Sequence, residues 1–163
     1  MTVGSAQGRM RAVRGRCFDM ALATTAERLR SSGMLQASPF LKWAGGKGQL
    51  LAQLEPLLPA RFGQYVEPFV GGGALFFRLR NLGRLAAGAT LCDSNAELVN
   101  CYRILQDAEG VAALIQILKR HVRHAANSDY FYRVRAWDRT AAFLERWGPV
   151  ERAARTLFLN HTC

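Results

Sequence analysis

The sequence has no long apolar run, no closely spaced pair of cysteines and very little lysine. No run of about 18 apolar residues occurs, so we expect no membrane-spanning helix. None of the cysteines (Cys17, Cys92, Cys101 and Cys163) stands in a Cys-x-x-Cys spacing, and the 3 histidines complete no set of metal ligands with them. We therefore expect no metal site, and reduced thiols in a cytoplasmic protein.

Acidic residues are also scarce. The 163 residues include 12 acidic side chains against 22 basic ones, and the formal net charge is +10. Such a charge favours a polyanionic partner, nucleic acid above all, although a preference for arginine over lysine also arises from genome composition. With 50% hydrophobic and 21% charged residues, the composition is that of an ordinary globular domain, which excludes collagen-like, disulfide-rich and disordered chains.

Residues 1–37 differ from the rest of the chain. They contain six arginines and two acidic residues, which account for +4 of the net charge, and no apolar stretch long enough for a secretory signal. We expect a basic, disordered arm here, with a short helix over residues 21–30 as an alternative. Met34 stands just before the first strongly patterned segment and is an alternative start of the native chain.

Beyond Pro39 the apolar residues recur with the periods of helices and short strands. The pattern predicts strands over residues 64–68 and 89–92 and helices over residues 48–58, 74–80, 94–106, 111–121, 130–146 and 151–159. Five leucines of the first helix form one stripe: Leu50, Leu51, Leu54, Leu57 and Leu58. Ser94 and Glu97 have the spacing of a capping box, Asn127 begins a turn-and-cap signal, and Pro149 suits the first turn of the last helix.

A glycine loop follows the first predicted strand and opens a helix. Residues 67–73 read Glu-Pro-Phe-Val-Gly-Gly-Gly, and such glycines let the backbone turn tightly and approach a ligand closely. Asp93 lies 20 residues after Gly73, at the end of the next strand, where a carboxylate accepts hydrogen bonds from ribose hydroxyls. This unit implies a cofactor that carries adenosine. The alternative is a structural turn followed by a helix-capping aspartate.

A second glycine-bearing segment, residues 39–47, precedes the first predicted helix. Trp43 offers a flat apolar face, Gly45 and Gly46 free the backbone, and Lys47 offers a positive charge. Since backbone donors at a helix start also favour an anion, a ligand carboxylate or phosphate suits this place. The alternative is a core tryptophan beside a solvated lysine.

Taken together, residues 39–47, 66–73 and 93–95 resemble the Dam-type DNA adenine-N6 methyltransferase family. The resemblance covers about residues 38–163, and the tail 157–163 looks like the family segment just before its DNA-contacting hairpin. It implies an α/β fold, a Rossmann-like methyltransferase sheet with a helical target-recognition insertion. The implied activity is transfer of a methyl group from S-adenosylmethionine to adenine N6 in double-stranded DNA.

The resemblance also implies roles for single residues. Trp43, Lys47 and Asp93 would contact S-adenosylmethionine, with Asp93 on the ribose and Lys47 on the carboxylate of the methionine part. The loop that contains Phe69, Gly71 and Gly73 would form the floor of the site.

One departure from the family pattern bears on completeness. Family members have an Asp-Pro-Pro-Tyr motif that accepts hydrogen bonds from the target adenine, and this sequence contains no Asp-Pro and no Pro-Pro. We therefore expect no catalytic residue in this chain, and an incomplete sheet. The expected organisation is a basic arm over 1–37, a cofactor-binding portion over 38–107 and the helical start of a target-recognition region over 108–163.

Aromatic residues and arginines alternate over residues 130–139. In a DNA-binding protein this pattern serves stacking and phosphate contacts, whereas in an ordinary helix the aromatics form core and the arginines a solvated face. Other interpretations of the whole chain are a non-catalytic cofactor- or DNA-binding module completed by a second chain, a decayed gene product, or an unrelated nucleotide-binding protein. The segment from Trp43 to Lys47 argues against the last. We expect a DNA-associated protein of bacterial or phage type, with a role in restriction-modification or regulation.

Overall fold

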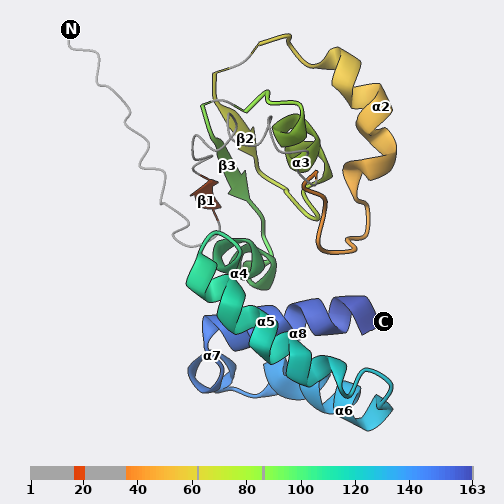
Figure 1. The fold of residues 1–163 in the computed structure, drawn as a ribbon, viewed down its shortest axis with the longest axis vertical. Coiled ribbons are helices and arrows are strands. Elements are labelled where there is room, and N and C mark those ends of the chain that lie inside the picture. The colour runs from red at the N-terminus through yellow and green to blue at the C-terminus, as the bar shows by residue number, and fades with distance from the viewer. Residues whose placement is uncertain (1–16, 21–35, 62, 86, 163) are drawn as a thin grey trace, which may run out of the picture.

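A small mixed sheet lies at one end of the protein. A computed structural model describes residues 17–20, 36–61, 63–85 and 87–162 (Figure 1). The strands are β1 (Cys17–Met20), β2 (Tyr65–Glu67) and β3 (Ala89–Cys92), and they lie in the order β1–β3–β2. β2 pairs with β3 in parallel and β1 pairs with β3 antiparallel, so the described part of the chain has a mixed α/β fold.

The helices form two groups. Near the sheet are η1 (Lys47–Leu50), α2 (Leu51–Leu54), η2 (Glu55–Leu57), α3 (Ala74–Asn81) and α4 (Ala96–Ile104). The second group is α5 (Ala108–Val122), α6 (Ser128–Arg135), η3 (Ala136–Arg139), α7 (Phe143–Arg146) and α8 (Pro149–Thr162). Figure 1 shows α2 and α3 beside the sheet, the second group gathered at the opposite end, and α4 between them. Among helices of the described residues, none is both long and apolar enough to cross a bilayer.

Both strands and most helices predicted from the sequence are confirmed, but the first helix differs. It begins and ends as 3-10 turns, with one α-helical turn between them. Its leucine stripe is not a buried face, because Leu57 is 79% exposed and Leu50 is 47% exposed. Pro56 explains the second 3-10 turn, since its nitrogen has no hydrogen to donate to the carbonyl of Ala52.

The predicted cap at Ser94 is wrong by one residue. Asn95 is the N-cap of α4, and its Oδ1 accepts hydrogen bonds from the backbone of Glu97 (3.0 Å) and Leu98 (3.1 Å). The carboxylate of Asp93 accepts the Asn95 N–H at 2.9 Å, which turns the chain so that Asn95 begins the helix. The predicted signal at Asn127 is confirmed, because its side chain accepts the Tyr130 N–H at 2.9 Å.

The helix predicted over residues 130–146 is broken into α6, η3 and α7. The guanidinium of Arg155 donates to the carbonyls of Val134 (2.9 Å) and Arg135 (2.7 Å). A continuous helix needs those carbonyls for its own N–H groups, so the buried Arg155 competes with it. The last predicted helix is confirmed as α8, with Pro149 at its first position.

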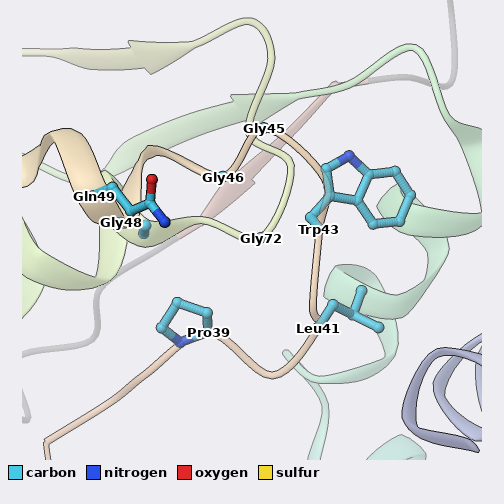
Figure 2. A pocket seen from close by; sticks show the side chains of 9 residues that line it. Pro39, Leu41, Trp43, Gly45, Gly46, Gly48, Gln49 and Gly72 are labelled. Carbon is cyan, nitrogen blue, oxygen red and sulfur yellow. The ribbon is translucent and has the colours of Figure 1, made fainter. Parts of the chain in front are cut away.

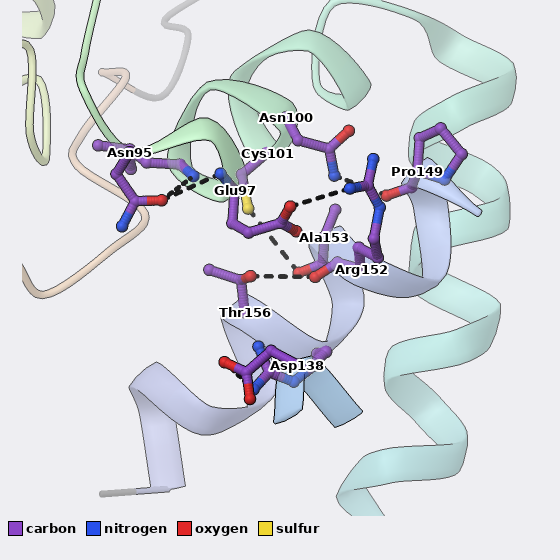
Figure 3. Close-up of polar contacts among 11 residues, drawn as sticks. Asn95, Glu97, Asn100, Cys101, Asp138, Pro149, Arg152, Ala153 and Thr156 are labelled. Atoms are coloured by element: carbon purple, nitrogen blue, oxygen red, sulfur yellow. Dashed lines mark hydrogen bonds and ion pairs between the residues drawn. The ribbon is translucent and has the colours of Figure 1, made fainter. Parts of the chain in front are cut away.

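Helices α4 and α8 connect the two groups (Figure 3). Ala153 and Ala154 are fully buried, and such small side chains let α8 approach α4 closely. On the flank of this contact, Arg152 pairs with Glu97 at 3.0 Å and the amide of Asn100 donates to the carbonyl of Pro149 at 2.7 Å. The helical group is thus fixed to the helix that follows β3.

β1 changes two expectations. Its Cys17 forms a disulfide with Cys92, so the prediction of reduced thiols is wrong for this pair. Cys101 is a free, buried thiol. The strand also lies within residues 1–37, for which a disordered arm is predicted; the remainder of that arm, with the alternative helix at 21–30 and Met34, lies outside the described residues apart from positions 36 and 37.

Candidate functional site

The glycine loop connects β2 to α3 at the edge where the parallel strands end. The N–H of Val70 donates to the carbonyl of Cys92 at 2.9 Å, and the Val70 side chain is buried, so the loop is held against the end of β3. Gly71 (φ +51) and Gly73 (φ +74) have left-handed backbone conformations that favour glycine. The loop therefore owes its shape to its glycines, as the sequence predicts.

Asp93 lies beside this loop, where the sequence places it. Its Oδ2 accepts the N–H of Gly71 at 3.0 Å, and its Oδ1 accepts the N–H of Asn95 at 2.9 Å. The hydroxyl of Tyr102 donates to the carbonyl of Gly71 at 3.0 Å, so both backbone polar groups of Gly71 are fixed by side chains. A carboxylate has about four acceptor positions, and about two remain on Asp93 for a ligand hydroxyl.

Trp43 packs directly on the same loop. A Cβ at Gly71 would lie 3.0 Å from Cδ1 of Trp43, and one at Gly72 would lie 3.1 Å from the carbonyl oxygen of Leu41. The two glycine-bearing segments, which are separate in sequence, are thus in van der Waals contact, and a side chain at Gly71 or Gly72 would push them apart.

Lys47 also contacts the loop, and it forms an ion pair. Its Nζ donates to Oε1 of Glu67 at 2.8 Å and to the carbonyl of Phe69 at 2.7 Å. These bonds use two of the three N–H donors of the ammonium group and leave one for a ligand. Sequence reasoning gives Glu67 no role, although an acid at the end of a strand directly before a glycine loop is a signal that could have found it.

The half-buried Tyr65 and the buried Tyr102 act as hydrogen-bond donors around the loop. The hydroxyl of Tyr65 donates to Oε2 of Glu67 at 2.7 Å. Burial, and then the bond to Glu67, raise the pKa of Tyr65 above its ordinary value. Burial, and then the charges of Glu67 and Asp93, likewise raise the pKa of Tyr102. Both phenols therefore stay neutral near pH 7 and fix the loop and the ion pair as donors.

A cavity of about 450 Å³ opens beside Trp43 (Figure 2). Its lining residues come from the first segment, η1, the glycine loop and the start of α3: Pro39, Leu41, Trp43, Gly45, Gly46, Gly48, Gln49, Gly72 and Ala74. Of the six predicted cofactor-binding residues, only Trp43 lines it. Lys47, Gly71 and Gly73 are sequence neighbours of lining residues. Asp93 and Phe69 lie one step further from the cavity, because Asp93 is bonded to Gly71 and the carbonyl of Phe69 to Lys47, and the side chain of Phe69 is 72% exposed. The structure thus brings all six residues to the glycine loop or into contact with it, and the cavity opens next to Trp43.

The aromatic and arginine-rich stretch over residues 130–139 serves mainly as packing. The ring of His121 is buried, with its centroid 5.0 Å from Phe158, 5.8 Å from Tyr130 and 5.9 Å from Trp137. Its Nδ1 lies 2.8 Å from the Tyr130 hydroxyl, and burial foremost lowers its pKa. The arginines of the stretch and of the end of α5 are exposed: Arg120, Arg123, Arg133, Arg135 and Arg139. Half-buried aromatics and exposed arginines thus occur side by side in this stretch, and Tyr132 is itself 62% exposed.

Comparison with known proteins identifies relatives. The sequence model for the D12 class N6 adenine-specific DNA methyltransferases matches residues 43–163. The chain is 37% identical over 131 residues to a type II methyltransferase, M1.LlaDCHI, of Lactococcus lactis subsp. cremoris. This match covers 80% of the present chain and 43% of the relative. It is 33% identical over 138 residues to the type II methyltransferase M.MjaIII of Methanocaldococcus jannaschii (79% of this chain, 47% of the relative). It is 34% identical over 128 residues to a DNA adenine methylase of Haemophilus influenzae (77% and 41%). The chain thus spans less than half the length of these relatives.

Proposed function

The chain belongs to the family of D12 class N6 adenine-specific DNA methyltransferases, and we propose on that premise that it binds the methyl donor S-adenosylmethionine for methylation of adenine N6 in double-stranded DNA. The observation that supports this proposal most is the convergence of Trp43, Lys47 and Asp93 on one glycine loop. The parallel unit β2–loop–α3–β3 supports a Rossmann-like sheet, since it is the crossover from which such sheets are built.

The residues present suit this cofactor in size and charge. A cavity of about 450 Å³ is within the usual range for a small-molecule site. The formal charges of Lys47, Glu67 and Asp93 leave one net negative charge, which complements a cofactor with a sulfonium, an ammonium and one carboxylate. Glycine at 72 leaves no side chain between the loop and Leu41, and the exposed ring of Phe69 offers an apolar surface to a flat base.

Each residue then has a distinct task. Asp93 accepts hydrogen bonds from the ribose hydroxyls, and Lys47 donates its remaining N–H to the carboxylate of the methionine part. Trp43 and Phe69 exclude water, while Gly71 and Gly73 allow close approach of the backbone. When bound, S-adenosylmethionine supplies an electrophilic methyl group, and these side chains orient it. We assign no residue of this chain to the adenine, because the sequence contains no Asp-Pro-Pro-Tyr motif.

The proposed organisation follows the same division. Residues 38–107 bind the cofactor, and residues 108–163 form the helical side that faces DNA, in a cytoplasmic protein of bacterial or phage type. The exposed arginines of α5 and α6 support the second part, since sequence-independent DNA binding depends on contacts of this kind with phosphates.

Calorimetry with S-adenosylmethionine tests the cofactor proposal. We expect wild-type protein to bind it and Asp93→Ala to bind roughly tenfold or more weakly, because a charge-assisted hydrogen bond is lost. Asp107→Ala is the matched control, since Asp107 also accepts a backbone N–H, at the start of α5 and away from the loop. Far-UV circular dichroism of each variant reports folding.

Lys47 needs a second design, because Lys47→Met alone leaves Glu67 buried without its partner. The double variant Lys47→Met/Glu67→Gln removes both charges. Either of two results with folded protein would overturn the proposed site: the double variant binds S-adenosylmethionine as tightly as wild type, or wild type does not bind it.

A further inference from the structure

Side chains from the end of α8 hold the backbone just before Trp43. Oδ1 of Asn160 accepts the N–H of Lys42 at 2.8 Å, and Nδ2 of Asn160 donates to the Lys42 carbonyl at 2.7 Å. The next residue, His161, donates from Nε2 to the carbonyl of Phe40 at 2.9 Å. An amide side chain presents a donor and an acceptor as a peptide does, so Asn160 takes the place of a neighbouring strand.

The same arrangement occurs at the other end of this segment. Asn81, the last residue of α3, accepts the N–H of Ala37 at 3.1 Å and donates to its carbonyl at 2.7 Å. Between the two asparagines, Leu41 is 4% exposed, and the ring of Phe40 packs edge-on against Tyr102. Within the described residues, segment 36–43 lies in no strand. The two asparagine side chains therefore replace the backbone hydrogen bonds that a neighbouring strand would make with it.

We propose that Asn160 is a positioning residue of the cofactor site: its paired hydrogen bonds to Lys42 fix Trp43 against the glycine loop. The contacts are continuous. Lys42 precedes Trp43, the ring of Trp43 lies against Gly71, and Gly71 is bonded to Asp93. The end of α8 is thereby connected to the residue that we assign to the ribose, and this consequence for the cofactor rests on the proposed function.

A nuclear magnetic resonance experiment reads the position of Trp43 directly. The chain has 3 tryptophans, and the indole N–H signal of Trp43 is assigned by its loss in Trp43→Phe. In Asn160→Ala we expect that signal to move and broaden while the signals of Trp137 and Trp147, which stack on each other away from the segment, stay in place. The Lys42 amide should also exchange with solvent faster.

Asn100→Ala is the matched control. Its amide also holds a backbone carbonyl between α4 and α8, that of Pro149, so the variant loses a comparable bond without touching segment 36–43. Asn160→Asp keeps an acceptor for the Lys42 N–H but loses the donor, and we expect an intermediate shift. For S-adenosylmethionine we expect roughly tenfold weaker binding to Asn160→Ala, from loss of two neutral hydrogen bonds, and unchanged binding to Asn100→Ala.

Two outcomes would overturn the proposal: a Trp43 signal unchanged in Asn160→Ala, or one that moves equally in Asn100→Ala. Failure of the proposed function is a separate result. If no variant, wild type included, binds S-adenosylmethionine, and Trp43 still moves only in the Asn160 variants, Asn160 positions Trp43 in a site with a different ligand.

Discussion

Two glycine-to-alanine variants, one in the glycine loop and one outside it, separate the free-energy cost of a left-handed backbone from that of steric overlap. In Gly73→Ala the new Cβ would lie 2.5 Å from the hydroxyl oxygen of Tyr102 and 3.1 Å from Cε2 of Phe77, at φ +74. Gly45 has nearly the same φ, +70, and nothing within 4 Å of a new Cβ. Gly45→Ala should therefore report the left-handed backbone cost alone, about 1 kcal/mol.

Gly73→Ala adds overpacking to that cost. Tyr102 is 1% exposed and its hydroxyl is bonded to the Gly71 carbonyl, so the ring has little freedom to withdraw. Overpacking of a core costs about 1–3 kcal/mol, and we expect Gly73→Ala to lose about 3 kcal/mol in total. The assay is urea unfolding, with the m value expected to be the same in all variants. The measured quantity is the difference in the free energy of unfolding between Gly73→Ala and Gly45→Ala.

A double variant tests the cause. Tyr102→Phe alone should cost about 1 kcal/mol for its hydrogen bond. Because it also removes the overlapping oxygen, Tyr102→Phe should be nearly neutral, or favourable, when introduced into Gly73→Ala. Equal losses in Gly45→Ala and Gly73→Ala, or additive losses in the double variant, would refute the steric reasoning.

Three further expectations follow from the structure. Burial lowers the pKa of His121 in the folded protein, so the neutral imidazole contributes to stability fully above the pKa of the unfolded chain, about 6.5. As the pH falls from there toward the lowered folded pKa, the free energy of unfolding decreases by at most about 1.4 kcal/mol per pH unit. Between pH 8 and 5 the urea midpoint should therefore fall less in His121→Phe than in wild type. Burial raises the pKa of Cys101 to about 12, so this thiol should react with a thiol reagent at pH 8 only after unfolding. Reduction before the assay should add the two thiols of Cys17 and Cys92 to the count, and in Cys17→Ser reduction should add none. Because the sequence has no Asp-Pro-Pro-Tyr motif, the isolated chain should transfer no labelled methyl group to adenine-rich DNA, and clear turnover would contradict the assignment.

The features predicted well from sequence are those whose causes are local. Glycines at 71 and 73 specify the left-handed turns of the loop whatever surrounds them, and Asp93 follows β3, so it lies at the same sheet edge as the loop after β2. The helix signals at Asn127 and Pro149 are equally local. Even the cap of α4 is missed by one residue only, because Asp93 takes the Asn95 N–H.

The features missed depend on residues far away in the chain. The break after α6 arises from Arg155, whose guanidinium captures carbonyls 20 and 21 residues earlier. Glu67 neutralises Lys47 across 20 residues, and Asn160 holds Lys42 across 118 residues. No periodicity or spacing encodes such pairs, since each depends on how whole helices pack.

These long-range pairs also bear on how the site binds a ligand. Asp93 and Lys47 are both held by protein groups, Asp93 by two backbone N–H donors and Lys47 by a carboxylate and a carbonyl. Side chains fixed in this way lose little conformational entropy when a ligand binds, which favours affinity. The same bonds restrict what can bind. A ligand carboxylate at Lys47 also meets Glu67, so it is accepted only when positive charge elsewhere on the ligand is near Glu67 or Asp93. A zwitterionic amino-acid group meets that condition and a simple phosphate does not, so the ion pair of Lys47 with Glu67 is an argument for the proposed ligand, S-adenosylmethionine, and against a nucleotide at this loop.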